Sequence, residues 1–104
     1  MAVYRNITGE LTQELLVAGG NISNPNIRLS NINTNNHQCK VDLYIEKKLT
    51  GKFYLIKDFI LHVGEPMTSK FIFSNSAGEF SLYIKLTKIF SGDTPAVDVI
   101  ITKW

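Results

Sequence analysis

The sequence predicts an all-β fold, a single antiparallel β-sandwich of about seven or eight strands, immunoglobulin-like or jelly-roll-like. Apolar and polar residues alternate with a period of two in several segments, which is typical of strands with one face in water. Turn-forming residues recur at intervals of roughly 8 to 12 residues, as in sandwiches and barrels. The 104 residues, 44% hydrophobic and 19% charged, have the size and composition of one globular domain.

The first quarter of the chain allows two interpretations. Leu11, Leu15 and Leu16 would suit a short helix that ends at Gly19-Gly20, whereas residues 12–18 could equally form a strand entered through a turn at Gly9-Glu10. We favour the strand, because the later elements are all β and short helices are marginal without packing. We expect residues 1–104 to form one domain, with an N-terminal arm over residues 1–20 as an alternative for that part.

A strand over residues 27–30 leads into the stretch SNINTNNHQCK, residues 30–40, which gathers four asparagines, one histidine and the only cysteine. Asparagine side chains bond to their own backbone and tolerate left-handed conformations, as a loop between antiparallel strands requires. The stretch therefore predicts a turn, and it is also a candidate polar binding loop. The residues of this candidate loop are Asn33, Asn35, Asn36 and His37.

The middle of the chain predicts a β-hairpin. In residues 41–46, which continue a strand that begins near Cys39, apolar and polar residues alternate cleanly, and Thr50-Gly51 then offers the positive backbone angle of a tight turn. Residues 53–61 follow as a nearly continuous run of β-branched and aromatic residues. We expect this second strand to be buried near the middle of a sheet.

The last third of the chain predicts three more strands. Gly64-Glu65-Pro66 breaks the chain, because proline cannot donate to a ladder and glycine favours a turn. The expected strands are a short one around residues 70–73, ended by a turn at 75–78, a clean one-faced strand over 80–87, and a last strand from Val97 toward Trp104 after a loop at 91–95.

Residues that could carry chemistry are few and poorly arranged in the sequence. His37, Cys39 and His62 supply at most three metal ligands without the paired spacing of a zinc site, and no nucleophile motif surrounds Cys39. Asp42 and Asp58 lie on neighbouring strands of the hairpin, but their alternation with apolar residues predicts solvent-facing carboxylates with ordinary acidity. No phosphate-binding, dinucleotide-binding or hydrolase motif is present. We therefore expect no catalytic, cofactor-binding or metal-binding residue and no enzyme.

Charge and targeting signals limit the partners. The formal charge is only +2, and the basic residues do not form the stripe that binding to nucleic acid requires. The first six residues lack the features of a secretory signal, and no window approaches 18 consecutive apolar residues. We expect synthesis in a cytoplasm and no contact with nucleic acid or membrane.

Aromatic side chains are the remaining candidates for an interface. Tyrosines on the polar face of a strand, or in mixed runs, can form a platform for a sugar or a protein, although a neighbouring strand or subunit can equally cover them. A terminal tryptophan either closes the end of the sandwich or docks onto a partner. The candidate interface residues are Tyr4, Tyr44, Tyr54, Tyr83 and Trp104.

Residues 27–67 resemble small β-sandwich virion proteins of tailed bacteriophages, especially those of marine cyanophages. The resemblance lies in an I-x-L-x-N strand, a polar loop, the segment VDLYIEK, a glycine turn and the segment KFYLIKDFILHVGEPM, and the opening MAVYRNIT is also similar. It consists of strand alternation and turn placement along these segments. No functional residue therefore transfers from it.

The resemblance implies a non-enzymatic structural protein present in many copies, or as a homo-oligomer, on a virion assembled in a host cytoplasm. Such proteins occur as capsid decoration or cement proteins bound to the major capsid protein, and as neck or tail components. A carbohydrate-binding module that recognises host glycans through Tyr44, Tyr54 or Tyr83 is the alternative from another class of protein.

Overall fold

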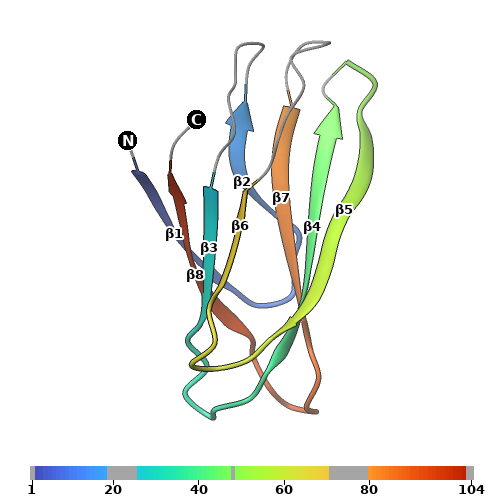
Figure 1. The fold of residues 1–104 in the computed structure, drawn as a ribbon. Coiled ribbons are helices and arrows are strands. Elements are labelled where there is room, and N and C mark those ends of the chain that lie inside the picture. The colour runs from blue at the N-terminus through green and yellow to red at the C-terminus, as the bar shows by residue number, and fades with distance from the viewer. Residues whose placement is uncertain (1, 19–25, 48, 71–79, 103–104) are drawn as a thin grey trace.

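The computed structural model describes residues 2–18, 26–47, 49–70 and 80–102. These residues form eight strands and no helix, and the strands build two four-stranded antiparallel sheets, which confirms the predicted β-sandwich (Figure 1). The strands are β1 (Ala2–Thr8), β2 (Gln13–Ala18), β3 (Asn26–Asn31), β4 (Cys39–Lys47), β5 (Lys52–Leu61), β6 (Met67–Lys70), β7 (Phe80–Lys88) and β8 (Ala96–Thr102).

The strand order is that of a jelly roll. One sheet has the order β1-β8-β3-β6 and the other β2-β7-β4-β5. Four antiparallel pairs are nested, since β1 pairs with β8, β2 with β7, β3 with β6 and β4 with β5. The chain is thus one long hairpin rolled into two sheets. Of the two sandwich types left open by the sequence, the jelly roll is the one formed.

The core lies between the two sheets and is made of the apolar residues that alternate along the strands. On β4 and β7 the same parity that the sequence indicates faces inward, for example Leu43 and Ile84, which are cross-strand neighbours without solvent exposure. The buried apolar residues are Ile7, Leu15, Ile27, Leu29, Cys39, Val41, Leu43, Leu61, Leu82, Ile84, Leu86, Val97, Val99 and Ile101.

Residues 2–18 supply one edge strand to each sheet. β1 runs along β8 over seven residue pairs, and β2 runs along β7 with a bulge between Glu14 and Leu16. The bulged residue, Leu15, is buried. The strand interpretation of residues 12–18 is therefore confirmed, with β2 beginning at Gln13. The sequence did not single out β1 as a strand.

The predicted turns match the described backbone. Asn36 has a φ of +62° and Gly51 a φ of +69°, so the asparagine-rich stretch and the hairpin turn both use the left-handed region. The break before Pro66 is a turn closed by a hydrogen bond from the Glu65 amide to the His62 carbonyl. The short strand expected around residues 70–73 is β6, which ends at Lys70. Residues 71–73, the turn expected at 75–78 and Trp104 lie outside the described residues.

The expected burial of the strand over residues 53–61 is wrong. β5 is an edge strand of its sheet, and Phe53, Tyr54, Leu55 and Ile56 are all exposed. A bulge causes part of this exposure, because Leu43 faces Lys57 while Tyr44 faces Leu55, which leaves Ile56 as the extra residue. A continuous apolar run is common in central strands, and the sequence does not reveal that this one lies at an edge.

A cation bridges the two sheets at each open side of the sandwich. On one side Arg5 of β1 donates from Nη2 to the Glu14 carbonyl of β2, at 2.9 Å. On the other side Lys57 of β5 donates from Nζ to Oγ of Ser69 of β6, at 2.7 Å. Both residues lie at positions whose cross-strand neighbours, Val99 and Leu43, point into the core.

Candidate functional site

The asparagine-rich loop is held by its own side chains. Nδ2 of Asn31 donates to the carbonyl oxygens of His37 (3.0 Å) and Leu61 (2.9 Å), and Oδ1 of Asn31 accepts from the Asn33 amide at 2.9 Å. Oδ1 of Asn33 in turn accepts from the Asn35 amide at 2.7 Å. Asn31 and Asn33 are buried. Their polar groups therefore satisfy the loop backbone and do not face a ligand.

Asp93 joins this network from the loop between β7 and β8. Nδ2 of Asn33 donates to both carboxylate oxygens of Asp93, at 3.0 and 2.8 Å. These bonds hold the pKa of Asp93 below its ordinary value, helped by Asn35 and by the nearby His37, while burial acts in the opposite direction. Nδ1 of His37 lies 3.6 Å from Oδ1 of Asp93, and its ring stacks on Phe90 with 4.2 Å between centroids.

The candidate polar loop is thus a structural cluster. Three of its predicted residues, Asn33, Asn35 and His37, meet around Asp93, and Asn36 provides the left-handed turn. The sequence could not reveal Asp93 as the centre of this cluster, because it lies 60 residues from Asn33.

Cys39 is not placed for nucleophilic chemistry. The side chain is 1% exposed, and burial together with the negative charge of Asp93 raises the pKa of the thiol to about 11. A thiol in such surroundings stays protonated and inert at neutral pH. Within the described part of the chain, no group of three or more His, Cys, Asp or Glu side chains is placed to hold a metal ion. The same residues contain no helix that could cross a membrane.

The two carboxylates of the hairpin are direct cross-strand neighbours, but they differ in exposure. Asp58 is exposed as predicted, whereas Asp42 is only 8% exposed, so the prediction of a solvent-facing side chain is wrong for Asp42. Two neighbouring lysines explain the burial of Asp42. Nζ of Lys40 lies 3.8 Å from Oδ1 of Asp42, and Lys85 is the cross-strand partner of Asp42 on β7.

Two of the predicted interface tyrosines lie together. Tyr44 of β4 and Tyr83 of β7 are cross-strand partners on the outer face of the sheet. The ring of Phe53 meets that of Tyr83 edge to face, with centroids 5.0 Å apart. Oη of Tyr83 lies 3.3 Å from Glu14 and 3.2 Å from Glu46. A shallow hollow of about 260 Å³ is lined by Thr12, Tyr44 and Phe53.

The other predicted interface residues do not join this pair. The bulge of β5 places Tyr54 opposite Ile45, so its ring belongs to the other face of the strand, where Nζ of Lys47 lies 5.4 Å from the ring centroid. Tyr4 lies on β1 in the other sheet and is 72% exposed. Trp104 lies outside the described residues.

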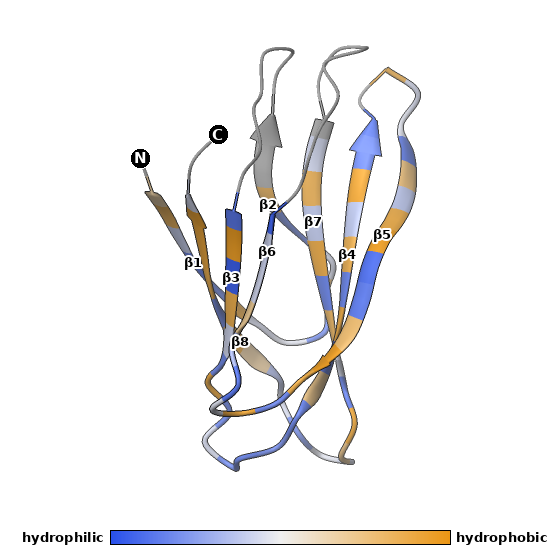
Figure 2. Cartoon of the chain, in the orientation of Figure 1, coloured by the Kyte–Doolittle hydropathy of each residue, from blue (hydrophilic) through white to orange (hydrophobic). Residues whose placement is uncertain are grey.

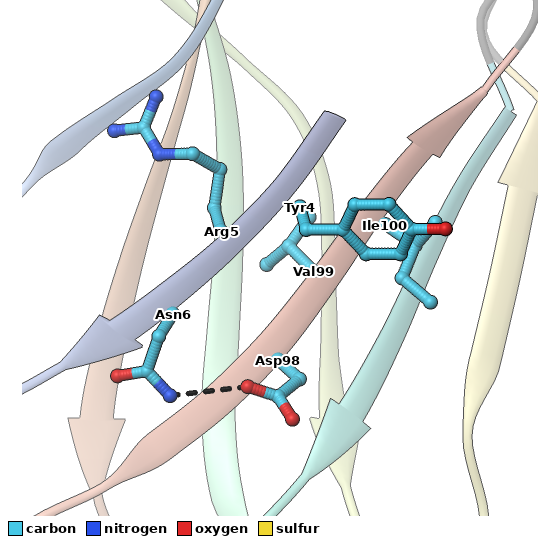
Figure 3. Close-up of a pocket in the computed structure, with 6 residues that line it drawn as sticks. All are labelled: Tyr4, Arg5, Asn6, Asp98, Val99 and Ile100. Carbon is cyan, nitrogen blue, oxygen red and sulfur yellow. Dashed lines mark hydrogen bonds between the residues drawn. The ribbon is translucent and has the colours of Figure 1, made fainter. Parts of the chain in front are cut away.

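A second hollow, of about 340 Å³, surrounds Tyr4 (Figure 3). Its polar groups do not converge on the hollow. Nδ2 of Asn6 donates to Oδ1 of Asp98 at 3.0 Å, and the Arg5 side chain extends away from the Tyr4 ring toward the opposite side of β1. The hollow therefore offers an exposed aromatic ring and little else for recognition.

The strongest surface feature is an apolar strip of which sequence reasoning singled out only Tyr54. It comprises Leu49, Phe53, Tyr54, Leu55 and Ile56, all exposed, with Leu49 at 82% and Leu55 at 52%. We call these five residues the β5 strip. Figure 2 shows apolar residues at the tip of the β4–β5 hairpin and along β5. Phe53 and Leu55 lie on the outer face of β5 and Tyr54 on the other, so the strip covers both faces of this edge strand. A run of exposed consecutive apolar residues is unusual unless it is functional, so the strip indicates a binding edge.

No protein-family model matches the chain, and no curated protein sequence matches it. Solved structures share its fold at very low identity. The crystal structure of PirA superposes with a TM-score of 0.61 at 8% identity, over 95% of this chain and 93% of PirA. The Yersinia pseudotuberculosis-derived mitogen superposes with a TM-score of 0.56 at 13% identity, over 100% of this chain and 86% of the mitogen.

A third similarity is weaker. A structure of the infectious bursal disease virus Gx strain gives a TM-score of 0.47 at 13% identity, over 96% of this chain but 32% of the viral chain. That score is too low to support an argument. The first two similarities establish the sandwich fold and say nothing about activity.

Proposed function

We propose that this protein is a non-enzymatic structural protein of a phage virion, a capsid decoration or cement protein bound to the head shell. A neck or tail module is the closest variant of the proposal. In either place the partners are other virion proteins, the chain is present in several copies, and it reaches the particle after synthesis in the host cytoplasm.

The observation that carries the proposal is the β5 strip. Four consecutive apolar side chains on an edge strand, together with Leu49 at the hairpin tip, are exposed in the isolated chain. Their exposure has a cost in water, which contact with a partner removes. A shell of repeated subunits supplies such contacts many times, so a modest affinity per copy is sufficient.

The interior of the protein supports the same proposal. The thiol of Cys39, where the polar loop enters β4, is buried with a raised pKa. The side chain of Asn31 bonds to backbone groups. The resemblance of residues 27–67 to phage virion proteins points to the same class. A β-sandwich with exposed apolar residues on an edge strand suits a decoration protein.

The test is to locate the protein in particles. Mass spectrometry of purified virions should detect it at many copies, and electron microscopy should place it on the head shell, or at the neck or tail for the variant. Virions made with the Leu55→Ser variant should carry less of the protein. Virions made with Leu11→Ser, at another exposed leucine, between β1 and β2, should carry as much as wild type. Abundant protein in infected cells with none in purified particles would contradict the proposal.

A glycan-binding module remains a second candidate because of one observation. Tyr44, Phe53 and Tyr83 gather on the outer face of one sheet, beside the carboxylates of Glu14 and Glu46. Aromatic rings stack on sugars, and carboxylates accept bonds from sugar hydroxyls. Robust binding on a glycan array that disappears in Tyr44→Ala, but persists in Tyr4→Ala on the other sheet, would favour this function over the structural one.

A further inference from the structure

The outer edge of β5 is open. The strand is the last in the order β2-β7-β4-β5, and within the described residues its only strand partner is β4 (Figure 1). In an antiparallel pair about half of the backbone N–H and C=O groups of an edge strand point away from the sheet. Ten residues of β5 therefore present a row of groups on which another strand can pair.

The two faces of this edge differ in chemistry. The register with β4 places Phe53 and Leu55 on the outer face, opposite Glu46 and Tyr44. It places Lys52, Tyr54 and Lys57 on the opposite face, opposite Lys47, Ile45 and Leu43. Nζ of Lys57 also donates to Oγ of Ser69. A strand added to β5 would therefore meet apolar side chains on its outer face, and two lysines with a tyrosine between them on the other face.

The charge of the hairpin is also distinct from that of the remaining chain. Residues 47–57 contain four lysines, at positions 47, 48, 52 and 57, and no acidic residue. Because the whole chain has a formal charge of +2, the remaining residues carry a formal −2. In the sequence the positive charge is thus concentrated in the segment between Glu46 and Asp58, and not spread over the protein as a whole.

From these three features we infer that β5 binds an extended segment of a partner protein in which apolar residues alternate with Asp or Glu, added as a fifth strand to its sheet. The apolar residues of the partner pack beside Phe53 and Leu55, and its carboxylates lie beside Lys52 and Lys57. The backbone bonds supply affinity, and the alternation supplies register and specificity.

Two other occupants fit less well. A second copy of the chain paired antiparallel through its own β5 would bring the two copies of Lys57, near the middle of the strand, close together, and like charges across a strand pair are destabilising. A membrane would leave the outward N–H and C=O groups of β5 without partners in hydrocarbon, which is costly. A partner strand with carboxylates satisfies both the backbone groups and the lysines.

This inference deepens the proposed function, because the bound segment would belong to a virion partner, but its test is separate. The ¹⁵N-labelled protein is titrated with an acetylated, amidated ten-residue peptide in which valine and glutamate alternate. The matched control peptide has lysine in place of each glutamate. We expect amide shifts along β5, at least tenfold tighter binding of the glutamate peptide, and weaker binding as salt rises.

Variants of the protein sharpen the result. Leu55→Ser should weaken binding of the glutamate peptide about tenfold, and Lys52→Glu about two- to fivefold. Leu11→Ser, remote from β5 in sequence and also exposed, should bind as wild type does. All three positions are exposed, so each variant should keep the thermal midpoint of the wild type, which is measured beside the titration.

Any one of the following results would overturn the inference: equal binding of the two peptides, no binding of either at millimolar concentration, shifts at β1 or β6 and not at β5, or sedimentation of the protein with phosphatidylserine vesicles. A dimer with protected β5 amides would assign the edge to a second copy and would also overturn it. If neither peptide binds but the protein is found in virions, only the inference about strand addition at β5 is rejected. Peptide binding by a protein absent from virions rejects only the proposed function.

Discussion

The loops around Asp93 and the open edge of β5 differ in which side chains they bury and which they expose. At the loop end, polar side chains turn inward: Asn31, Asn33 and Asp93 are buried and bond to one another or to the backbone. At the β5 edge, Leu55 and its neighbours are apolar and turn outward. Both regions reverse the usual distribution of polar and apolar residues.

The two reversals have different physical meanings. The buried amide of Asn31 makes three bonds, two within its own loop and one to Leu61 of β5, and so lowers the free energy of the folded chain. Its loss leaves backbone groups without partners. An exposed leucine contributes little to the folded chain and becomes favourable only when a partner covers it. The loop end therefore serves stability, and the β5 edge is available for recognition. Substitutions in the two regions should separate these roles.

The largest effect is expected for Asn31→Ala at the loop end. The substitution removes both donors to the His37 and Leu61 carbonyls and the acceptor for the Asn33 amide. Because these groups are mostly buried, we expect the free energy of unfolding to fall by about 3 kcal/mol. Urea denaturation at neutral pH measures this change.

Thr34→Ala is the matched control for that measurement. Thr34 lies in the same loop but is exposed, so its substitution should change the free energy of unfolding by less than about 0.5 kcal/mol. Similar denaturation midpoints for Asn31→Ala and Thr34→Ala would show that the polar network does not stabilise the fold. The loop would then again be a candidate for ligand binding.

An effect of similar or smaller size is expected at alkaline pH through Cys39. Its folded pKa of about 11 lies above the ordinary value of 9.0, so the unfolded chain loses the thiol proton first. The stability due to the buried thiol is therefore complete below pH 9 and is lost as pH rises toward 11. By linkage the loss is about 2 to 3 kcal/mol.

The pH dependence is read as a difference between two proteins. Denaturation midpoints of wild type and Cys39→Ala are compared from pH 8 to pH 11, so that titration of lysines and tyrosines cancels. The wild type should lose stability relative to the variant across this range. Parallel curves, or rapid labelling of the native thiol at pH 8, would contradict the burial of Cys39.

For both regions the sequence predicted the strands and turns better than the contacts that they make with distant parts of the chain. The alternation on β4 and the turn at residues 30–40 could be predicted, because parity and turn chemistry depend on neighbouring residues. The partnership of Asn33 with Asp93 could not, because it joins loops 60 residues apart. The position of β5 at an edge could not either, because strand order arises from pairing of the whole chain.

The tyrosines show the same limit at the candidate site. Tyr44 and Tyr83 were predicted on the polar face of their strands and lie side by side, since no bulge interrupts the pairing of β4 with β7. Tyr54 was expected in the same set but faces the other way, because the bulge at Ile56 shifts the parity of β5. A one-residue irregularity of this kind leaves no clear signature in the sequence.

The smallest effect on stability, and the sharpest contrast with Asn31→Ala, is expected for Leu55→Ser. Leu55 is 52% exposed on an edge strand, so the substitution removes little buried surface and leaves the β4 pairing intact. We expect a change in the free energy of unfolding of less than about 0.5 kcal/mol by urea denaturation. A loss near that of Asn31→Ala would mean that Leu55 is covered within the folded chain, and the β5 edge would then be part of the core and not a surface for a partner.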